Sequence, residues 1–419
     1  MRVIVQKFGG TSLATAADRQ RAAGHVARAR GEGFSPVVVV SAMGRSGDPY
    51  ATDTLLALVR ETWNGAQPRE VDLLVSCGEL ISASLMAITL QAVGIDAVAL
   101  SGAQAGIVTD GQFGEAAIVR VEPGRVLDCL GRAQVAVVAG FQGATETGEA
   151  TTLGRGGSDT TAAALGAALG AEVVEIYTDV DGVKTADPRL VPEARTLEVV
   201  GYEEIAQMAV EGARVVHPRA VEIAMRNNVP LRVRSTFTQD PGTLVTHRFQ
   251  AAPATPDLRL NRIITGVTFI PGLARLCLRV EGEDAALADL DLRVFKGLAR
   301  AGISVDLINV SPATKSFCIK EEQVEQALQV LARQGLAAEV TPGCAKVSVV
   351  GQGMRGVPGV MASVVEALHG AGVKILQTSD SHVTISCLVR ADQLHPAVRA
   401  LHRQFRLDRL PGGPGEVQG

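Results

Sequence analysis

The chain has 419 residues, of which 47% are hydrophobic and 20% are charged. It is too long for one hydrophobic core and too apolar to be disordered, so we expect two or three globular domains. A net charge of -4 at pH 7, with no basic block interleaved with aromatics, argues against nucleic-acid and membrane partners. Six scattered cysteines without a CxxC pair argue against a zinc site or a disulfide framework. We expect a cytoplasmic protein with neither a targeting segment nor a membrane span.

The first 245 residues alternate short apolar runs with helix-like stretches. The runs are VIVQKF, PVVVV, AVAL, AQVAVVAG and EVVEIYTDV. Near-continuous Val, Ile and Ala runs separated by helices are typical of parallel strands buried on both faces. Residues 1–245 therefore predict an α/β domain, a mostly parallel sheet sandwiched by helices, and such sheets bind ligands at the carboxyl ends of their strands.

Polar, glycine-bearing loops follow several of these strands. KFGGTS supplies Lys7, Gly9 and Gly10, a cation beside backbone amides that could hold a phosphate, and VVVVSAMG adds Ser41. A solitary strand-end lysine is more often simply solvated, but several such loops on one sheet edge are hard to explain by packing. A further loop, YTDVDGVKTADPR, contains Thr178, Asp179, Lys184 and Arg189.

The segment TLGRGGSDTTAAALGAALGA, residues 152–171, runs from a glycine-rich turn into an alanine-rich helix. Ser158 and Asp159 are preferred N-cap residue types, a helix N-terminus attracts anions, and Arg155 offers a planar fork for a carboxylate or phosphate. The structural alternative is a tight turn with a surface arginine. No GxxxxGK[ST] or strand-linked GxGxxG is present, which excludes Walker-type and Rossmann-type phosphate sites.

The C-terminal part contains a repeat. Residues 246–260 predict an interdomain linker, and VFKGLARAGISV at 294–305 then matches VVEALHGAGVKI at 364–375. Each copy continues into strand-like residues and a second helix, which predicts two tandem ferredoxin-like βαββαβ modules over 261–341 and 342–408. Residues 409–419 predict a flexible tail.

Five motifs occur in this order, followed by the paired modules: KFGGTS, VVSAMG, SCGELISA, TLGRGGSDTTA and YTDVDGVKTADPR. In these motifs and modules the chain resembles the aspartate kinases of the amino-acid kinase superfamily. The tandem modules of these enzymes are ACT domains. SAMGRSGDPYATD and ILQTSDSHVTISCLV are most similar to the diaminopimelate-sensitive, monofunctional type of Gram-positive bacteria. The resemblance implies ATP-dependent phosphorylation of the side-chain carboxylate of L-aspartate to 4-phospho-L-aspartate. This is the first step of lysine, threonine and methionine (diaminopimelate) biosynthesis, under feedback regulation.

The resemblance also implies roles for individual residues. ATP and Mg²⁺ are the expected cofactors, with the metal held by phosphates rather than by a cage of side chains. Catalysis is assigned to Lys7, Asp159, Gly9 and Gly10, and aspartate binding to Thr52, Glu79, Arg155 and Ser158. ATP binding is assigned to Lys7, Gly9, Gly10, Ser41, Thr178, Asp179, Lys184, Arg189 and Arg214.

Physical chemistry favours such a set. A carboxylate with a pKa near ~3.9 is already ionised, so no general base is needed. Two unit charges ~4 Å apart repel by ~4 kcal/mol at an effective dielectric of ~20, so charge neutralisation must carry the catalysis. Structural alternatives are a first-turn glutamate for Glu79 and a plain N-cap for Asp159. Lys184 stands where many relatives carry an aromatic residue, and Arg214 where many carry lysine.

Regulation is expected in the paired modules. Candidate effector-lining residues are Met354, Val357, Pro358, Ile375 and Gln377, with lysine, threonine or diaminopimelate as the effector and a homodimer formed through the ACT domains. Two other functions remain open: another amino-acid or nucleotide monophosphate kinase, such as a glutamate 5-kinase, and a catalytically inert amino-acid-binding regulator. The paired modules and the arginine of GRGGSDT disfavour the first, and intact Lys7 and Asp159 disfavour the second.

Overall fold

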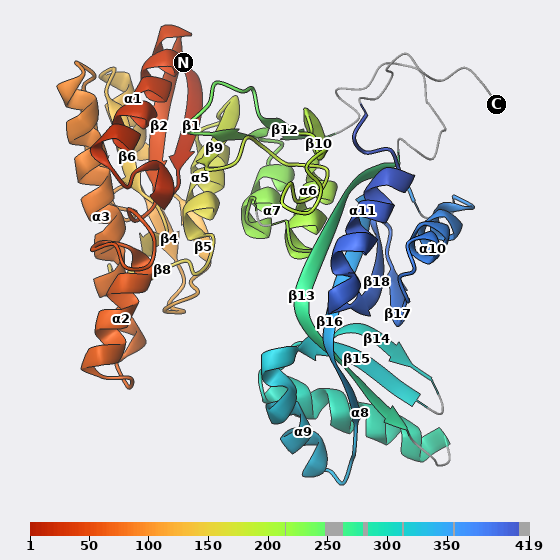
Figure 1. Ribbon diagram of the computed structural model, residues 1–419. Coiled ribbons are helices and arrows are strands. Elements are labelled where there is room, and N and C mark those ends of the chain that lie inside the picture. The colour runs from red at the N-terminus through yellow and green to blue at the C-terminus, as the bar shows by residue number, and fades with distance from the viewer. Residues whose placement is uncertain (214, 248–262, 280–283, 312–313, 355–356, 410–419) are drawn as a thin grey trace, which may run out of the picture. The chain divides into compact units, whose positions relative to one another are not determined.

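A computed structural model describes residues 1–213, 215–247, 263–279, 284–311, 314–354 and 357–409 (Figure 1). Most of the predicted linker (246–260), nearly all of the predicted tail (409–419) and Arg214 lie outside the described residues. The chain divides into two compact units. The first comprises Met1–Val183, Thr196–Val210 and Arg214–Ala254, and the second comprises Lys184–Arg195, Glu211–Ala213 and Thr255–Gly419.

An eight-stranded sheet forms the centre of the first unit, in the order β10-β12-β11-β9-β1-β2-β6-β3. Only the β11–β12 pair is antiparallel, which confirms the predicted mostly parallel α/β sheet. The strands are β1 (Arg2–Phe8), β2 (Phe34–Val40), β3 (Ala97–Leu100), β6 (Val135–Ala139), β9 (Val173–Thr178), β10 (Val199–Gly201), β11 (Leu231–Ser235) and β12 (Thr243–Thr246).

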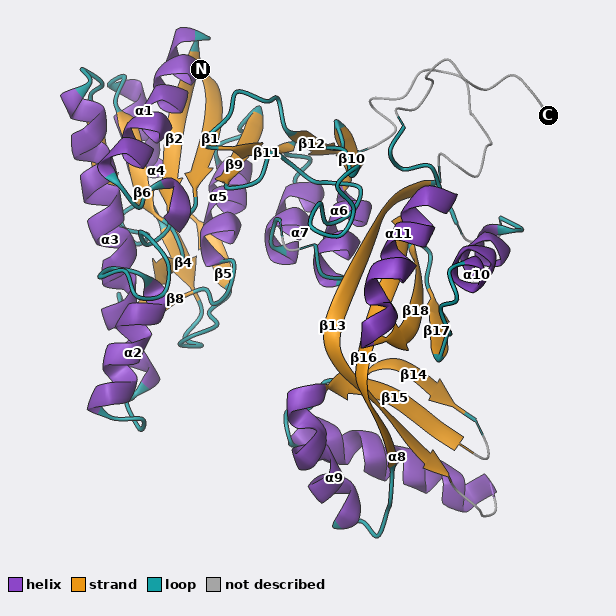
Figure 2. Cartoon of the chain, in the orientation of Figure 1, coloured by secondary structure: helices purple, strands orange, loops and turns teal. Residues whose placement is uncertain are grey.

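Helices cover both faces of this sheet (Figure 2). The helices of the first unit are α1 (Ala16–Gly31), α2 (Thr52–Thr62), α3 (Pro68–Ala92), α4 (Gly124–Gly131), α5 (Gly157–Ala168), α6 (Tyr202–Val210) and α7 (Pro218–Arg226). Of these, α2 packs against α3 rather than on the sheet. Tyr177 of β9 belongs to the apolar core that α1 and α3 share with the sheet. Val174 points to the other face, because side chains alternate along a strand, and there a Cβ added to Gly166 of α5 would lie 2.3 Å from it.

A small four-stranded sheet, in the order β5-β4-β7-β8, lies at the carboxyl end of the large one. Its strands are β4 (Ile107–Thr109), β5 (Ile118–Val121), β7 (Gln142–Ala144) and β8 (Ala150–Thr152). Helix α3 packs against β8. By length and composition alone α3 could cross a membrane, but 50% of its apolar window is buried inside the protein.

The second unit contains a six-stranded antiparallel sheet in the order β14-β15-β13-β16-β18-β17. Its strands are β13 (Ile264–Arg279), β14 (Asp306–Val310), β15 (Thr314–Lys320), β16 (Glu339–Gly351), β17 (Gln377–Asp380) and β18 (Thr384–Arg390). Its helices are α8 (Asp284–Arg300), α9 (Val324–Ala332), α10 (Val360–Gly370) and α11 (Leu394–Gln404).

The two modules of this unit are not consecutive in the chain, unlike the prediction of 261–341 followed by 342–408. Strands β13 and β16 pair along most of their length, with breaks in register, and each contributes to both modules. The start of β13 pairs with the end of β16 and supplies Ile264 and Val267 to the core of the second module. The later part of β13 pairs with β15 and packs in the core of the first. The repeat in the sequence could not reveal this exchange, because it matches the helices and not the strands that are shared.

Two short segments between strands and helices of the first unit belong to the second unit, whereas the sequence predicted one unbroken domain over 1–245. Leu190 and Val191 lie in the apolar core of the second module. The Thr185 carbonyl accepts a hydrogen bond from the Val267 amide (2.8 Å). Glu211 forms an ion pair with Lys346 of β16 (3.0 Å). Both segments are therefore held by specific contacts of the second unit.

Candidate active site

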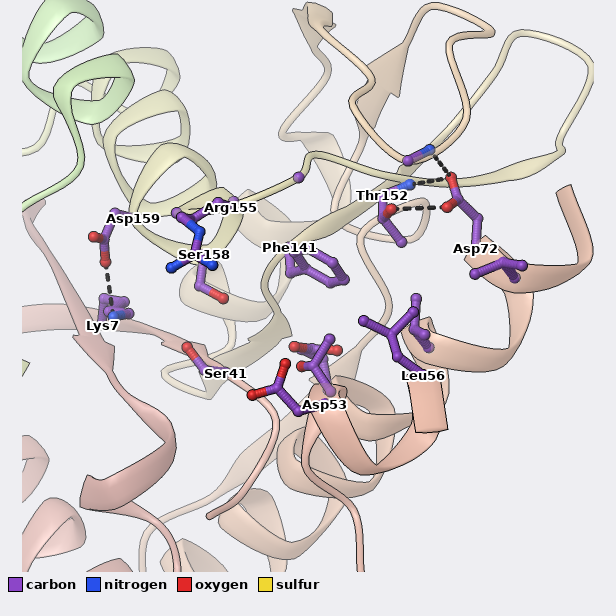
Figure 3. A pocket seen from close by; sticks show the side chains of 18 residues that line it. Lys7, Ser41, Asp53, Leu56, Asp72, Phe141, Thr152, Arg155, Ser158 and Asp159 are labelled. Carbon is purple, nitrogen blue, oxygen red and sulfur yellow. Dashed lines mark hydrogen bonds and ion pairs between the residues drawn. The ribbon is translucent and has the colours of Figure 1, made fainter. Parts of the chain in front are cut away.

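A cavity of about 490 Å³ lies in the first unit, at the carboxyl ends of β1 and β2 (Figure 3). Its walls come from the starts of α2 and α5, the first half of α3, and the turn that leads from β8 into α5. The lining residues are Lys7, Ser41, Thr52, Asp53, Leu56, Val71, Asp72, Val75, Glu79, Gly114, Phe141, Thr152, Gly154, Arg155, Gly156, Gly157, Ser158 and Asp159. Seven side chains predicted for the site thus meet in one cavity.

Lys7 and Asp159 form the charged pair at one end of the cavity. Lys7 Nζ lies 2.7 Å from Asp159 Oδ1, and both side chains are 12% exposed. Asp159 is in the first turn of α5, where the helix dipole favours a negative charge. The pair therefore holds an ammonium group at the cavity wall with enough exposure to meet a ligand.

The turn before α5 presents Arg155 to the cavity. The N-cap of α5 is Gly156, in the left-handed conformation (φ 73°), so the helix begins at Gly157, and the expectation that Ser158 or Asp159 caps it is wrong. Glycine adopts this conformation without a Cβ penalty, which lets the helix start earlier. Ser158 and Asp159 consequently lie inside the first turn. Arg155 is exposed, and among the residues that the structure describes its guanidinium has no hydrogen-bond or ion-pair partner.

Glu79 is a buried carboxyl group, 2% exposed, in the middle of α3. The alternative of a first-turn glutamate is wrong, because α3 begins at Pro68. The Ala42 amide donates to Glu79 Oε1 (3.0 Å), whereas Oε2 has no hydrogen-bond partner within the described chain. Burial raises the pKa of Glu79 to about 8, and the hydrogen bond from Ala42 lowers it in part. A cationic group entering the cavity would satisfy the open oxygen and favour the ionised form.

The two predicted phosphate-loop glycines have different local roles. A Cβ on Gly10 would lie 2.5 Å from the Ala42 carbonyl oxygen, so only glycine allows the loops after β1 and β2 to approach this closely. The Gly9 amide donates to the Tyr177 carbonyl (3.2 Å). That amide is therefore engaged within the protein in this structure, which differs from its expected use as a phosphate donor.

Four of the residues assigned to ATP binding do not line the cavity: Thr178, Asp179, Lys184 and Arg189. Asp179 follows β9 and pairs with Arg45 (2.8 Å), and Thr178 donates to Asp179 (3.1 Å). Lys184 and Arg189 belong to the second unit, where Arg189 Nη2 lies 2.6 Å from Asp187 Oδ2. The ATP contacts assigned to these residues stay predictions.

Asp72 is a lining residue that the sequence reasoning missed. It is 1% exposed and accepts hydrogen bonds from the Thr152 amide (2.7 Å), the Thr152 hydroxyl (2.8 Å) and the Gly114 amide (2.9 Å). It thereby ties α3 to the small sheet (Figure 3). An aspartate inside an apolar helix was the signal. Phe141, with φ 66°, was also missed, and its sequence context carries no comparable signal.

The donor set suits a phosphate group better than a caged metal ion. Among the described residues there is no cluster of three or more His, Cys, Asp or Glu side chains that could hold a metal ion. Lys7 and the N-terminus of α5 offer positive charge and amide donors, which is the chemistry of anion binding.

The candidate effector residues lie in the second module. Met354 is buried in its core, and Val357 and Ile375 pack against that core, whereas Pro358 is exposed. Gln377 Oε1 accepts hydrogen bonds from Arg275 Nε (3.1 Å) and Ser316 Oγ (3.1 Å), and its Nε2 donates to the Leu307 carbonyl. Gln377 therefore links the two modules, and effector binding by this set stays a prediction.

Known proteins resemble the whole chain. The model of the amino acid kinase family matches residues 2–235, and an ACT domain model matches residues 339–403. Aspartokinase 1 of Bacillus subtilis is 48% identical over 409 residues (98% of this chain and 100% of the relative), and aspartokinase of Thermus thermophilus is 41% identical over 420 residues (98% and 100%). The crystal structure of Escherichia coli aspartokinase III with aspartate and ADP has a TM-score of 0.76 at 26% identity, covering 96% of this chain and 99% of that one.

Proposed function

Since this chain belongs to the aspartate kinases of the amino acid kinase family, we propose that it transfers the γ-phosphoryl group of ATP to the side-chain carboxylate of L-aspartate, forming 4-phospho-L-aspartate. The observation that carries the proposal is the single cavity in which the Lys7–Asp159 pair, Arg155 and Glu79 meet. These groups match a substrate with two carboxylates and one ammonium.

The cavity separates the contacts that such a substrate needs. Arg155, with help from Ser158, binds the α-carboxylate through its planar fork. The open oxygen of Glu79 accepts the α-ammonium, and Thr52 at the start of α2 supports the bound aspartate. Placing the α-groups in this way directs the side-chain carboxylate toward Lys7.

Phosphoryl transfer then depends on charge neutralisation. The nucleophile is an ionised carboxylate, so its repulsion by the triphosphate is the main obstacle. Lys7, oriented by Asp159, and the N-terminus of α5 stabilise the charge that spreads over the transferring group. Mg²⁺ bound with the nucleotide phosphates supplies further positive charge.

The proposal on regulation is supported by ligands bound in a related enzyme. One crystal structure of Escherichia coli aspartokinase III is a complex with aspartate and ADP, and another is a complex with lysine and aspartate. We propose that this chain catalyses the first step toward lysine, threonine and methionine and responds to lysine, threonine or diaminopimelate through its ACT modules. We further propose a cytoplasmic homodimer formed through those modules.

An acceptor comparison tests the catalytic proposal. The purified chain is incubated with Mg·ATP and L-aspartate, L-glutamate or UMP, and ADP formation is measured together with trapping of the acyl phosphate by hydroxylamine. Turnover with aspartate and formation of the aspartyl hydroxamate are expected. Turnover with glutamate or UMP instead would indicate a different kinase, and no turnover with any acceptor would favour the inert regulator.

An inhibition panel tests the regulatory proposal. Initial rates are measured with lysine, threonine and diaminopimelate, singly and in pairs, using the full chain. Deleting the second unit is a poorer test, because Leu190 and Val191 would lose their core. Inhibition by at least one compound is expected, and unchanged rates with all three contradict feedback control by these end products.

A further inference from the structure

The start of α7 contacts residues 153–159, the turn before α5 and the first residues of that helix, from outside the cavity. His217 is the N-cap of α7, with φ −74° and ψ 135°, and α7 packs along α5. Neither His217 nor Arg219 lines the cavity. Both nevertheless contact the segment that carries Arg155 and Asp159.

Three contacts hold this segment. The His217 amide donates to Asp159 Oδ2 (3.3 Å), and Arg219 Nη1 donates to the Leu153 carbonyl (3.3 Å). Between them the His217 ring covers Gly156, where an added Cβ would lie 2.1 Å from ring atom Cγ. The contacts thus fall at positions 153, 156 and 159, on either side of Arg155 and Ser158.

The contact with Asp159 bears on the charged pair. Asp159 uses Oδ1 for Lys7 Nζ (2.7 Å) and Oδ2 for the His217 amide. A carboxylate held at one oxygen can rotate about its terminal torsion, whereas a second contact fixes its plane. The position of Lys7 Nζ follows that plane, and small displacements of a charge-stabilising group cost rate.

The imidazole is suited to a neutral packing role. Its Nδ1 accepts a hydrogen bond from the Arg219 amide (3.4 Å), which requires an unprotonated nitrogen. Burial lowers the pKa of His217; Asp159 opposes this shift, and Arg219 and Arg155 add to it. The ring can therefore lie against Gly156 without adding a third cation beside the two arginines.

We propose that His217 and Arg219 are positioning residues for phosphoryl transfer: through Asp159, Gly156 and Leu153 they set the orientation of Lys7 and Arg155 without touching substrate. This inference rests on the proposed function and extends it to a second layer of residues.

A pair of His217 variants separates the amide from the ring. Because φ is −74°, His217→Pro can keep the backbone conformation while it deletes the N–H, whereas His217→Asn keeps the N–H and offers a new capping oxygen. We expect His217→Pro to lower kcat about ten- to hundredfold, with a smaller change in the KM for aspartate, and His217→Asn to retain most of the turnover. His247→Asn, at a histidine that contacts Tyr202 and Asn228, is the matched control and should leave both constants unchanged.

The ring contact has its own test, which is useful if His217→Pro folds poorly. Gly156→Ala places a methyl group against the ring and should lower kcat, and His217→Ala in the same chain should recover part of the loss. If the wild type is active but the His217→Pro variant keeps its kcat, the positioning role alone is overturned. The same holds if His217→Ala does not recover the kcat lost in Gly156→Ala. A wild type without turnover on aspartate overturns the proposed function and the positioning role together.

Discussion

Buried charge is arranged differently in the two units. In the second unit, Lys346 is 4% exposed at its side chain and is surrounded by protein acceptors: Glu211 Oε2 (3.0 Å) and the Asp306 carboxylate. Ser348 donates a further hydrogen bond to Glu211 (2.6 Å). In the first unit, Lys7 keeps 12% exposure, and Glu79 keeps one oxygen without a partner in the described chain.

The difference separates structural charges from binding charges. A buried ion whose hydrogen bonds are all made inside the protein has nothing left to offer a ligand, whereas one left incomplete at a cavity wall gains a partner when the ligand arrives. In the sequence, Lys7 of VIVQKF and Lys346 of AKVSVV look alike, as single lysines beside valine-rich runs. Only their surroundings distinguish them.

The largest expected effect concerns the structural lysine. Lys346→Met leaves Glu211 buried without its cation and should destabilise the protein by about 3–5 kcal/mol, as breaking a buried pair does. Thermal unfolding measures the loss. Lys320→Met, at a lysine that is 70% exposed, is the control and should change little. An unchanged melting temperature for Lys346→Met would remove the contrast between the two lysines.

The catalytic lysine should behave in the opposite way. Lys7→Ala is expected to lower kcat by about 10²–10³, because it removes positive charge from the transferring phosphoryl group. The melting temperature and the KM for aspartate should change little. Arg120→Ala, whose pairs with Glu122 and Glu146 lie outside the cavity, serves as the control in the same assay. A raised aspartate KM at constant kcat would mean that Lys7 binds aspartate.

Within the first unit, Arg155 is expected to serve substrate binding rather than charge stabilisation. Arg155→Ala should raise the KM for aspartate about ten- to hundredfold with a smaller change in kcat, because the charge-assisted contact with the α-carboxylate is lost. Arg155→Lys should recover only part of the affinity, since a point charge cannot reproduce the planar fork. Steady-state kinetics over a wide range of aspartate decide this. A fall in kcat alone would exchange the roles of Arg155 and Lys7.

The smallest effect is a pH dependence at Glu79. Its pKa of about 8 means that the empty site holds a proton at neutral pH, which an incoming ammonium must displace. Affinity for aspartate should therefore strengthen between pH 6.5 and 8, by up to about tenfold per pH unit for one displaced proton, and level off above pH 8. Glu79→Gln should bind aspartate more weakly and lose this dependence. A wild-type KM that is flat over this range contradicts the assignment.

The same group has a defined effect on stability. The folded-state pKa of Glu79 lies above its ordinary value of 4.5. Between these two pKa values the folded protein therefore binds more protons than the unfolded chain does. The stability of the empty enzyme should consequently fall as the pH rises from about 4.5 to about 8. Glu79→Gln should show a higher melting temperature than the wild type at pH 8 and above.

Much of the first unit could be predicted because its signals are local. Valine-rich runs predict buried parallel strands, and glycine-bearing loops at their carboxyl ends predict where polar side chains gather. Lys7, Glu79, Arg155 and Asp159 were found in this way, with the family resemblance, although they lie in separate segments. Asp72 was not predicted, because its carboxylate oxygens accept hydrogen bonds from Thr152 and Gly114, which lie far from it in the sequence.

The sequence by itself therefore determined the fold class, the two ferredoxin-like modules and, together with the family resemblance, the chemical types at the site, because apolar periodicity and loop composition are properties of neighbouring residues. Only the tertiary structure decided which module the ends of β13 serve, that Glu211 belongs to the second unit, and which buried lysine is open to a ligand. Those outcomes depend on strand register and on contacts between distant segments, and no local pattern encodes them.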